Sequence, residues 1–211
     1  MNIHELRAEH PKEFEREYHK WLAHEPYYDW WEDTVEPFKE NGPAKGFRVD
    51  DVTFAGYGSW GDSAAWTGLV HLPTYIGAMP DASTEPRWQI IKALVDGGWI
   101  SSQVGVITSG RGAAPYSMSL VWPEVLHPNQ LVIDSEDGKI RQGMFAGADV
   151  SELFDAIGGD QAVGQLMDRM LDDVRSYADD IYYALRDDYE HLTSEESFIE
   201  YCDCNEVEFD V

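Results

Sequence analysis

The segment from Asp160 to about Tyr189 constrains the fold more than any other part of the sequence. Its apolar residues follow one another at alternating steps of four and three: Met167, Leu171, Val174, Ala178, Ile181 and Leu185. Such steps place side chains on one face of an α-helix, because 3.6 residues make one turn. The sequence therefore predicts a long helix, capped by Asp160, whose apolar face is buried against a sheet or another helix.

The remaining circumference of this helix is acidic. Three aspartate pairs recur at steps of seven and eight, which returns each pair to nearly the same side of the helix: Asp172 and Asp173, Asp179 and Asp180, Asp187 and Asp188. The acidic surface is extended by Asp168, Glu190, Glu195 and Glu196. Neighbouring carboxylates on a helix lie about 5 to 6 Å apart, which resembles the spacing of successive phosphates on a nucleic-acid strand. This surface is either a phosphate mimic or a solvated acidic face.

The charge of the whole chain limits its partners. Fifteen lysines and arginines against 40 acidic residues give a net charge of −25 over 211 residues. Binding to nucleic acid or to an anionic membrane requires clustered basic residues, so both are disfavoured and we expect a basic or neutral protein partner. No apolar run approaches the roughly 20 residues that span a bilayer, and the first residues do not resemble a signal peptide. We therefore expect a cytoplasmic protein.

Two shorter helices are predicted at the N-terminal end. Pro11 suits a first helical turn, and Phe14, Tyr18 and Trp21 then share one face of a helix over about 11 to 24. Pro26 restarts a helix that Asn41, Gly42 and Pro43 end. We expect these helices to form a hairpin. Their aromatic faces, which include Tyr27, Tyr28, Trp30 and Trp31, are either core packing or a ligand platform.

The middle of the chain predicts an antiparallel sheet. Short alternating runs between turn residues predict strands near 47–57, 64–72, 99–107, 116–122, 130–134 and 139–145. Asp137 and Gly138 suit the turn of the last hairpin, and a single helix over 85–96 interrupts the strands. The predicted fold is α+β, as one domain over 1–211. Its parts are a helical hairpin at 1–45, a sheet at 46–148, and an acidic helical part at 149–211 that begins with a short helix over 150–157.

A glycine-rich segment is the strongest candidate for a ligand loop. Gly58, Ser59, Gly61 and Asp62 can turn the backbone sharply and present amide groups to an anion. Their spacing matches neither the Walker A motif nor the dinucleotide fingerprint. The competing interpretation is a strand, a glycine-rich turn and a second strand, with the Asp62 side chain capping the turn.

Signals for an enzyme are weak. The seven histidines show no zinc-binding spacing, and the acids at 134 to 137 are out of register with a calcium loop. Cys202 and Cys204 lie in an acidic setting that does not activate a thiol. We therefore expect no catalytic residues, no metal and no cofactor. The oligomeric state stays open.

Two stretches carry a family resemblance. The segment from Phe54 to Gly68, with its Gly-Tyr-x-Ser-x-Gly-Asp core, is similar to small uncharacterised proteins of tailed phages, which usually have Gln in place of Trp60 and Gly in place of Ser63. The run from Asp188 to Glu196, with Leu-Thr-Ser-Glu-Glu, and the later run from Asn205 to Phe209 resemble the end of the same family. The likeness covers about a third of the chain and brings no established activity with it. It implies a phage origin and a location in the host cytoplasm.

These observations favour one function over two others. The leading hypothesis is a phage-encoded inhibitor that mimics nucleic acid and blocks a basic host protein, such as a nucleic-acid-binding or defence complex, in the manner of antirestriction and anti-CRISPR proteins. The first alternative is an enzyme or small-ligand-binding protein that uses the glycine-rich segment 56–62. The second is adaptation to high salt, which an acid excess spread evenly over the surface would favour.

Overall fold

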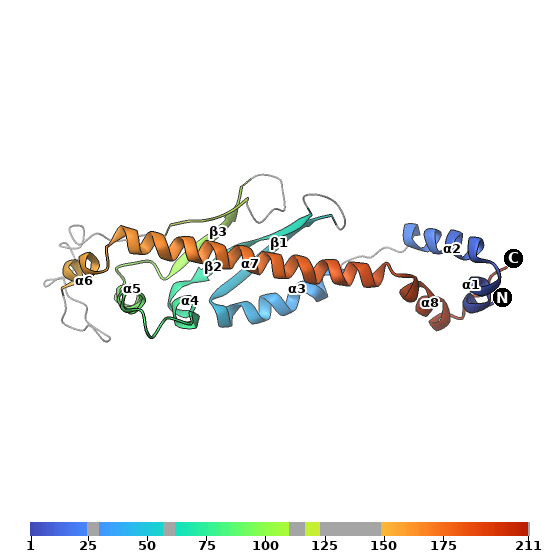
Figure 1. The fold of residues 1–211 in the computed structure, drawn as a ribbon, viewed down its shortest axis with the longest axis horizontal. Coiled ribbons are helices and arrows are strands. Elements are labelled where there is room, and N and C mark those ends of the chain that lie inside the picture. Colours follow the sequence, from blue (N-terminus) through green and yellow to red (C-terminus); the bar gives the residue numbers. More distant parts are fainter. Residues whose placement is uncertain (25–29, 57–61, 110–116, 123–148, 211) are drawn as a thin grey trace. The chain divides into compact units, whose positions relative to one another are not determined.

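The structure, a computed structural model, describes residues 1–24, 30–56, 62–109, 117–122 and 149–210 (Figure 1). It confirms the predicted α+β class, with an antiparallel sheet, N-terminal helices and a long C-terminal helix. The chain divides into two compact units. The terminal unit comprises Met1–Thr34 and Tyr183–Val211, and the sheet unit comprises Val35–Tyr182. The predicted single domain over 1–211 stays a prediction.

The sheet unit is built on four antiparallel strands in the order β1-β2-β3-β4. The strands are β1 (Phe47–Ala55), β2 (Ser63–His71), β3 (Gln103–Thr108) and β4 (Met118–Leu120). The first two pair in a hairpin register, from Phe47 opposite Val70 to Ala55 opposite Ser63. Four of the six predicted strands are present, although β3 begins four residues later than predicted. The predicted strands at 130–134 and 139–145, with their turn at 137–138, lie outside the described residues.

Helices precede, interrupt and follow the sheet. They are α3 (Trp30–Asn41), the 3-10 helix η1 (Gly42–Lys45), α4 (Leu72–Ala78), α5 (Pro86–Asp96), α6 (Val150–Ala156) and α7 (Asp160–Leu192). The prediction of a single helix within the sheet region was wrong, because α4 follows β2 directly. At seven residues α4 is too short to show a clear helical period, but its Leu72, Tyr75 and Ile76 are buried.

Helix α7 packs its apolar face onto the sheet. The indole Nε1 of Trp66, a fully buried residue of β2, donates a hydrogen bond to the carbonyl of Val174 at 3.2 Å. Val174, Ala178 and Ile181 are all buried, as the spacing predicts. Leu171 was wrongly placed in this face, since it is only half-buried while Met170 is fully buried. Adjacent residues of a helix point about 100° apart, so Met170 and Leu171 cannot both face the sheet. The flexible side chain of Met170 takes the buried position.

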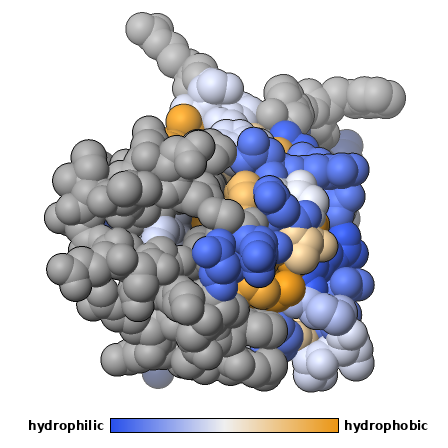
Figure 2. Space-filling model, turned by 90° about the vertical axis from the view of Figure 1, so that its left-hand side faces the viewer, coloured by the Kyte–Doolittle hydropathy of each residue, from blue (hydrophilic) through white to orange (hydrophobic). Residues whose placement is uncertain are grey.

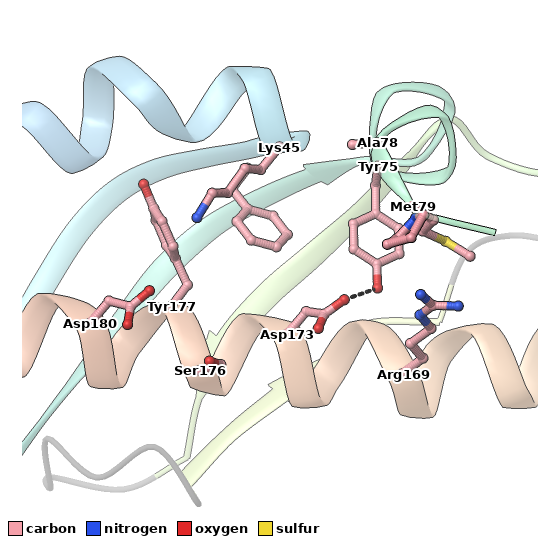
Figure 3. Close-up of a pocket in the computed structure, with 11 residues that line it drawn as sticks. Lys45, Tyr75, Ala78, Met79, Arg169, Asp173, Ser176, Tyr177 and Asp180 are labelled. Carbon is pink, nitrogen blue, oxygen red and sulfur yellow. Dashed lines mark hydrogen bonds between the residues drawn. The ribbon is translucent and has the colours of Figure 1, made fainter. Parts of the chain in front are cut away.

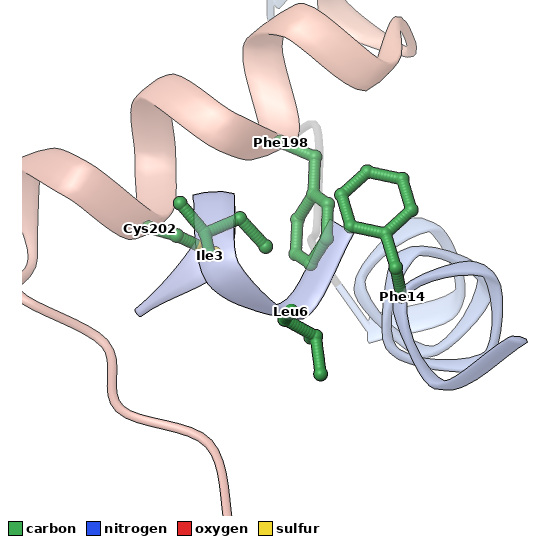
Figure 4. Close-up of a cluster of buried hydrophobic side chains, with 5 residues drawn as sticks. All are labelled: Ile3, Leu6, Phe14, Phe198 and Cys202. Carbon is green, nitrogen blue, oxygen red and sulfur yellow. The ribbon is translucent and has the colours of Figure 1, made fainter. Parts of the chain in front are cut away.

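The terminal unit has its own small core. Its helices are α1 (Ile3–Glu9), α2 (Pro11–His24) and α8 (Glu195–Cys204), together with the ends of α3 and α7. Ile3, Leu6, Phe14, Phe198 and Cys202 form a buried cluster that joins all three helices (Figure 4). The helix predicted over 11–24 is confirmed, and the ring centres of Trp21 and Phe198 lie 5.4 Å apart. The aromatic face of α2 is therefore core packing.

Two helices of the terminal unit were not predicted, although each carries a capping signal. Asn2 and Glu5 form a capping box at the start of α1, and the Ser194 side chain accepts from the backbone N–H of Ser197 at the start of α8. Residues 25–29, with Tyr27 and Tyr28, lie outside the described part of the chain.

The described surface is mainly hydrophilic on the face that Figure 2 shows, which is the side that lies to the left in Figure 1. Among the described helices, none combines the length and the apolar character needed to cross a membrane.

Candidate acidic surface and adjoining pocket

The structure divides the ten predicted acidic site residues between the two units. Asp168, Asp172, Asp173, Asp179 and Asp180 belong to the sheet unit, and Asp187, Asp188, Glu190, Glu195 and Glu196 belong to the terminal unit. All are exposed apart from the half-buried Glu195. The predicted exposure of the aspartate pairs is therefore confirmed.

In the sheet unit, three carboxylates follow one side of α7 at steps of four and seven. We call Asp168, Asp172 and Asp179 the acidic stripe. None of them makes a hydrogen bond or an ion pair to another described residue. Arg175 lies in the same row, but its Nη2 is directed at the carbonyl of Met118, 3.4 Å away. Desolvation of its carboxylate, and then the nearby charge of Asp180, raise the pKa of Asp179.

In the terminal unit, most of the predicted acids have a partner. Glu195 pairs with Arg7 at 2.8 Å, and the Arg186 guanidinium lies 2.8 Å from Asp187 and 3.7 Å from Glu190. Asp188 accepts a hydrogen bond from the Thr34 hydroxyl at 2.5 Å. The acids that the sequence presents as one continuous surface are therefore of two kinds. Glu195 and Asp188 join separate elements of the terminal unit, and Asp187 and Glu190 pair with Arg186 within α7, whereas the acidic stripe makes no such contact.

The second member of each aspartate pair in the sheet unit lies beside a pocket. This pocket of about 400 Å³ lies between α7, the end of η1, and α4 with the residues that follow it (Figure 3). Its lining combines aromatic and apolar residues with charged ones: Lys45, Phe47, Tyr75, Ala78, Met79, Pro80, Arg169, Asp173, Ser176, Tyr177 and Asp180. The sequence does not predict this pocket, because three distant segments form it and one of them is the unpredicted α4.

Hydrogen bonds fix several polar groups at the pocket. The Tyr75 hydroxyl donates to Asp173 at 2.5 Å (Figure 3), and burial together with this bond raises the pKa of Tyr75. The Arg169 Nη1 donates to both carboxylate oxygens of Asp81, at 2.8 and 2.9 Å. Asp81 also accepts from the Trp88 indole, and these bonds lower the pKa of Asp81. The charge of Arg169 is thus already balanced.

A lysine already lies on the aromatic wall of the pocket. The Lys45 ammonium is 4.9 Å from the centre of the Tyr177 ring, while the Tyr177 hydroxyl donates to the carbonyl of Phe38 at 2.6 Å. Burial and the charge of Asp180 raise the pKa of Tyr177. Gly46 brings Lys45 close to α4, because its φ of 85° suits glycine and a Cβ here would be 2.7 Å from the backbone nitrogen of Tyr75.

The glycine-rich candidate loop is only partly described. Gly58, Ser59 and Gly61 lie outside the described residues, so their role as a ligand loop stays a prediction. Asp62 is described, and its carboxylate lies against Gly56, where a Cβ would be 1.9 Å from Oδ1. Gly56 has φ 72°, and the flanking residues pair as a hairpin. These contacts favour the interpretation of this segment as a turn between two strands.

Groups that could hold a metal are absent from the described residues. Cys202 is buried in the terminal unit, where burial and the charge of Asp203 raise the pKa of its thiol to about 11, whereas Cys204 is exposed. A neutral, buried thiol is a poor nucleophile and a poor ligand.

Comparisons with known proteins return no matching family model, no matching curated protein and no matching solved structure. Function must therefore be argued from the residues of this chain.

Proposed function

We propose that this protein is an acidic inhibitor that binds a basic, nucleic-acid-binding surface of another protein by presenting carboxylates where phosphates would lie. The observation that carries this proposal is the acidic stripe of Asp168, Asp172 and Asp179 on α7, because its charges have no partner among the described residues. A carboxylate that is neither paired nor buried keeps its full attraction for a cation on another molecule.

The helix beneath the stripe supports this role. Met170, Val174 and Ile181 are fully buried on the opposite side of α7, so the carboxylates stand on a packed element whose backbone geometry is fixed. Their regular spacing is therefore set before binding, and little conformational entropy is lost when a partner docks. The net charge of −25 adds long-range attraction for a basic partner.

The resemblance to tailed-phage proteins indicates where the partner would be found. A phage-encoded inhibitor would act in the host cytoplasm, on a nucleic-acid-binding protein or a defence complex of the host. The alternative of uniform adaptation to high salt is less favoured, because Glu195, Asp187 and Glu190 of the terminal unit are paired while the acids of the stripe are not.

The test is a competition measured with matched variants. The purified chain is immobilised and exposed to purified basic nucleic-acid-binding proteins of the host, with and without duplex DNA, over a series of salt concentrations. The stripe variant carries Asp168→Asn, Asp172→Asn and Asp179→Asn, and it leaves the pocket residue Asp180 unchanged. The control variant removes the same charge from exposed acids elsewhere in the sheet unit, through Glu40→Gln, Asp51→Asn and Glu152→Gln.

We expect DNA to displace the partner, salt to weaken binding, and the stripe variant to lose affinity by at least about tenfold more than the control. Binding that survives DNA, or that both variants weaken equally, would contradict the mimicry of phosphates by this stripe.

A further inference from the structure

The pocket beside the acidic stripe offers a more specific prediction about the partner. We infer that this pocket receives the side chain of an arginine that projects from the basic surface of the partner. The inference rests on the proposed function, and it names the side chain that anchors the complex.

Two carboxylates frame the position that the arginine would take. Asp173 and Asp180 are seven residues apart on α7, which places them about 10 Å apart along the helix, and Tyr177 stands between them (Figure 3). Asp180 has no partner among the described residues, and Asp173 uses one carboxylate oxygen for Tyr75. Both acids therefore keep acceptor capacity for a guanidinium group.

The aromatic wall supplies the second element of recognition. In this structure the Lys45 ammonium lies over the Tyr177 ring, which marks the ring face as a place where a cation is stable. Lys45 is exposed and makes no ion pair with another described residue, so it can move into solvent when a partner's cation arrives. The Lys45 ammonium thus occupies the place over the Tyr177 ring that the arginine of the partner would take.

The charge balance of the pocket permits a second cation. Arg169 is already bonded to both oxygens of Asp81, so it opposes an incoming cation only weakly. Once Lys45 leaves, Asp173 and Asp180 are the remaining charges without an ionic partner. An anionic ligand would instead have to approach these two carboxylates on a chain of net charge −25.

Arginine fits this arrangement better than lysine does. A planar guanidinium stacks on an aromatic ring and can donate two parallel bonds to one carboxylate, whereas an ammonium is a compact, strongly hydrated charge. Phe47 and Met79 provide apolar surface for the methylene groups of the side chain. Arginines seated in such pockets are frequent centres of binding energy at protein interfaces.

The first experiment uses a small probe and needs no partner protein. N-acetyl-arginine-methylamide is titrated into the isotope-labelled full chain and followed by nuclear magnetic resonance. The matched probe is the citrulline analogue, which has nearly the same shape without the charge. We expect saturable shifts at the backbone amides of Lys45, Tyr75 and Tyr177 with the arginine probe. Equal binding of both probes, or shifts spread over other acidic regions, would overturn the inference.

Variants at adjacent positions provide the control. Asp180→Asn removes a carboxylate of the pocket, and Asp179→Asn removes the neighbouring carboxylate, which does not line it. Both residues are exposed, so both variants should fold. We expect Asp180→Asn to weaken the arginine probe about fivefold to tenfold and Asp179→Asn less than twofold. Lys45→Met should tighten the probe about twofold or more, because it removes the competing ammonium. An equal effect of both aspartate variants, or weaker binding by Lys45→Met, would contradict the pocket.

The two proposals fail in different ways. If the partner competes with DNA through the acidic stripe while the arginine probe does not bind, the proposed function stands and the pocket is refuted. If the probe binds the pocket while stripe and control variants bind the partner equally, the mimicry by the stripe is refuted and the cation site stands.

Discussion

The two units use acidic residues for different purposes. In the terminal unit Arg7 pairs with Glu195 and so joins α1 to α8, and Arg186 pairs with Asp187 and Glu190 within α7. In the sheet unit Asp168, Asp172 and Asp179 have no described partner and face solvent. Acidic residues that follow one another in the sequence therefore do not all form one surface for binding. The positions of a few arginines decide which carboxylates are structural and which are available for binding.

The largest expected effect concerns the two separate cores. Trp66→Ala in the sheet unit and Phe198→Ala in the terminal unit each remove a large buried ring, which costs about 3 to 5 kcal/mol. Hydrogen exchange should rise in β1, β2 and β3 for the first variant, and in α1, α2 and α8 for the second. If either substitution accelerated exchange equally in both units, the units would unfold together and the comparison would fail.

The thiols of α8 test whether the terminal core is closed. Cys202 is buried with a pKa of about 11, and Cys204, two residues away, is exposed. At pH 8 the thiolate fraction of Cys202 is about two hundredfold below that of an ordinary thiol, since an ordinary pKa is about 8.5. We expect iodoacetamide, followed by mass spectrometry, to modify Cys204 first by at least this factor. Similar rates would mean that the cluster around Cys202 opens readily.

Matched tyrosine variants compare a charged acceptor with a neutral one within the sheet unit. Tyr75→Phe removes the bond to the Asp173 carboxylate, and Tyr177→Phe removes the bond to the Phe38 carbonyl. We expect losses of about 1.5 kcal/mol or more for the first and about 1 kcal/mol for the second, because bonds to charged groups are stronger. Urea denaturation measures both. A larger loss from Tyr177→Phe would show that the Asp173 bond adds little to folding.

The smallest effect separates paired from unpaired acids directly. Glu195→Gln breaks the pair with Arg7 and should cost up to about 1 kcal/mol, a loss that high salt reduces. Asp172→Asn breaks no described contact and should leave stability unchanged or raise it by a few tenths of a kcal/mol, about the size of one like-charge repulsion on a helix. Thermal melts at low and high salt measure the difference. Equal costs for the two variants would remove the distinction between the units.

Local signals allowed most of the elements to be predicted from the sequence. Pro11 marks the start of α2, Asn41 marks the end of α3, and the long apolar period defines α7. The signals failed where an element was short, as in α4, or where two neighbours competed for one buried position, as Met170 and Leu171 did.

The candidate site was harder to predict than the fold, because its parts are distant in the sequence. The acidic stripe could be read from α7 alone, since helical spacing places Asp168, Asp172 and Asp179 on one side. The pocket could not, because Lys45 and Tyr75 reach α7 only through the tertiary structure. The pairing of Arg7 with Glu195 spans 188 positions and has no local signal.

The terminal unit joins segments that are far apart in the sequence, and this affects the order in which the chain can fold during synthesis. The backbone groups of Met1 and Phe209 are hydrogen bonded to each other, and Phe198 and Cys202 complete the cluster that Ile3 and Leu6 begin. On the ribosome, α1 and α2 therefore wait until α8 and Phe209 have been translated, whereas the sheet unit has all of its residues once Tyr182 has emerged. The sheet unit can thus fold before the terminal unit, although α1 and α2 are translated before the sheet. A chain that stops before α8 leaves Leu6 and Phe14 exposed.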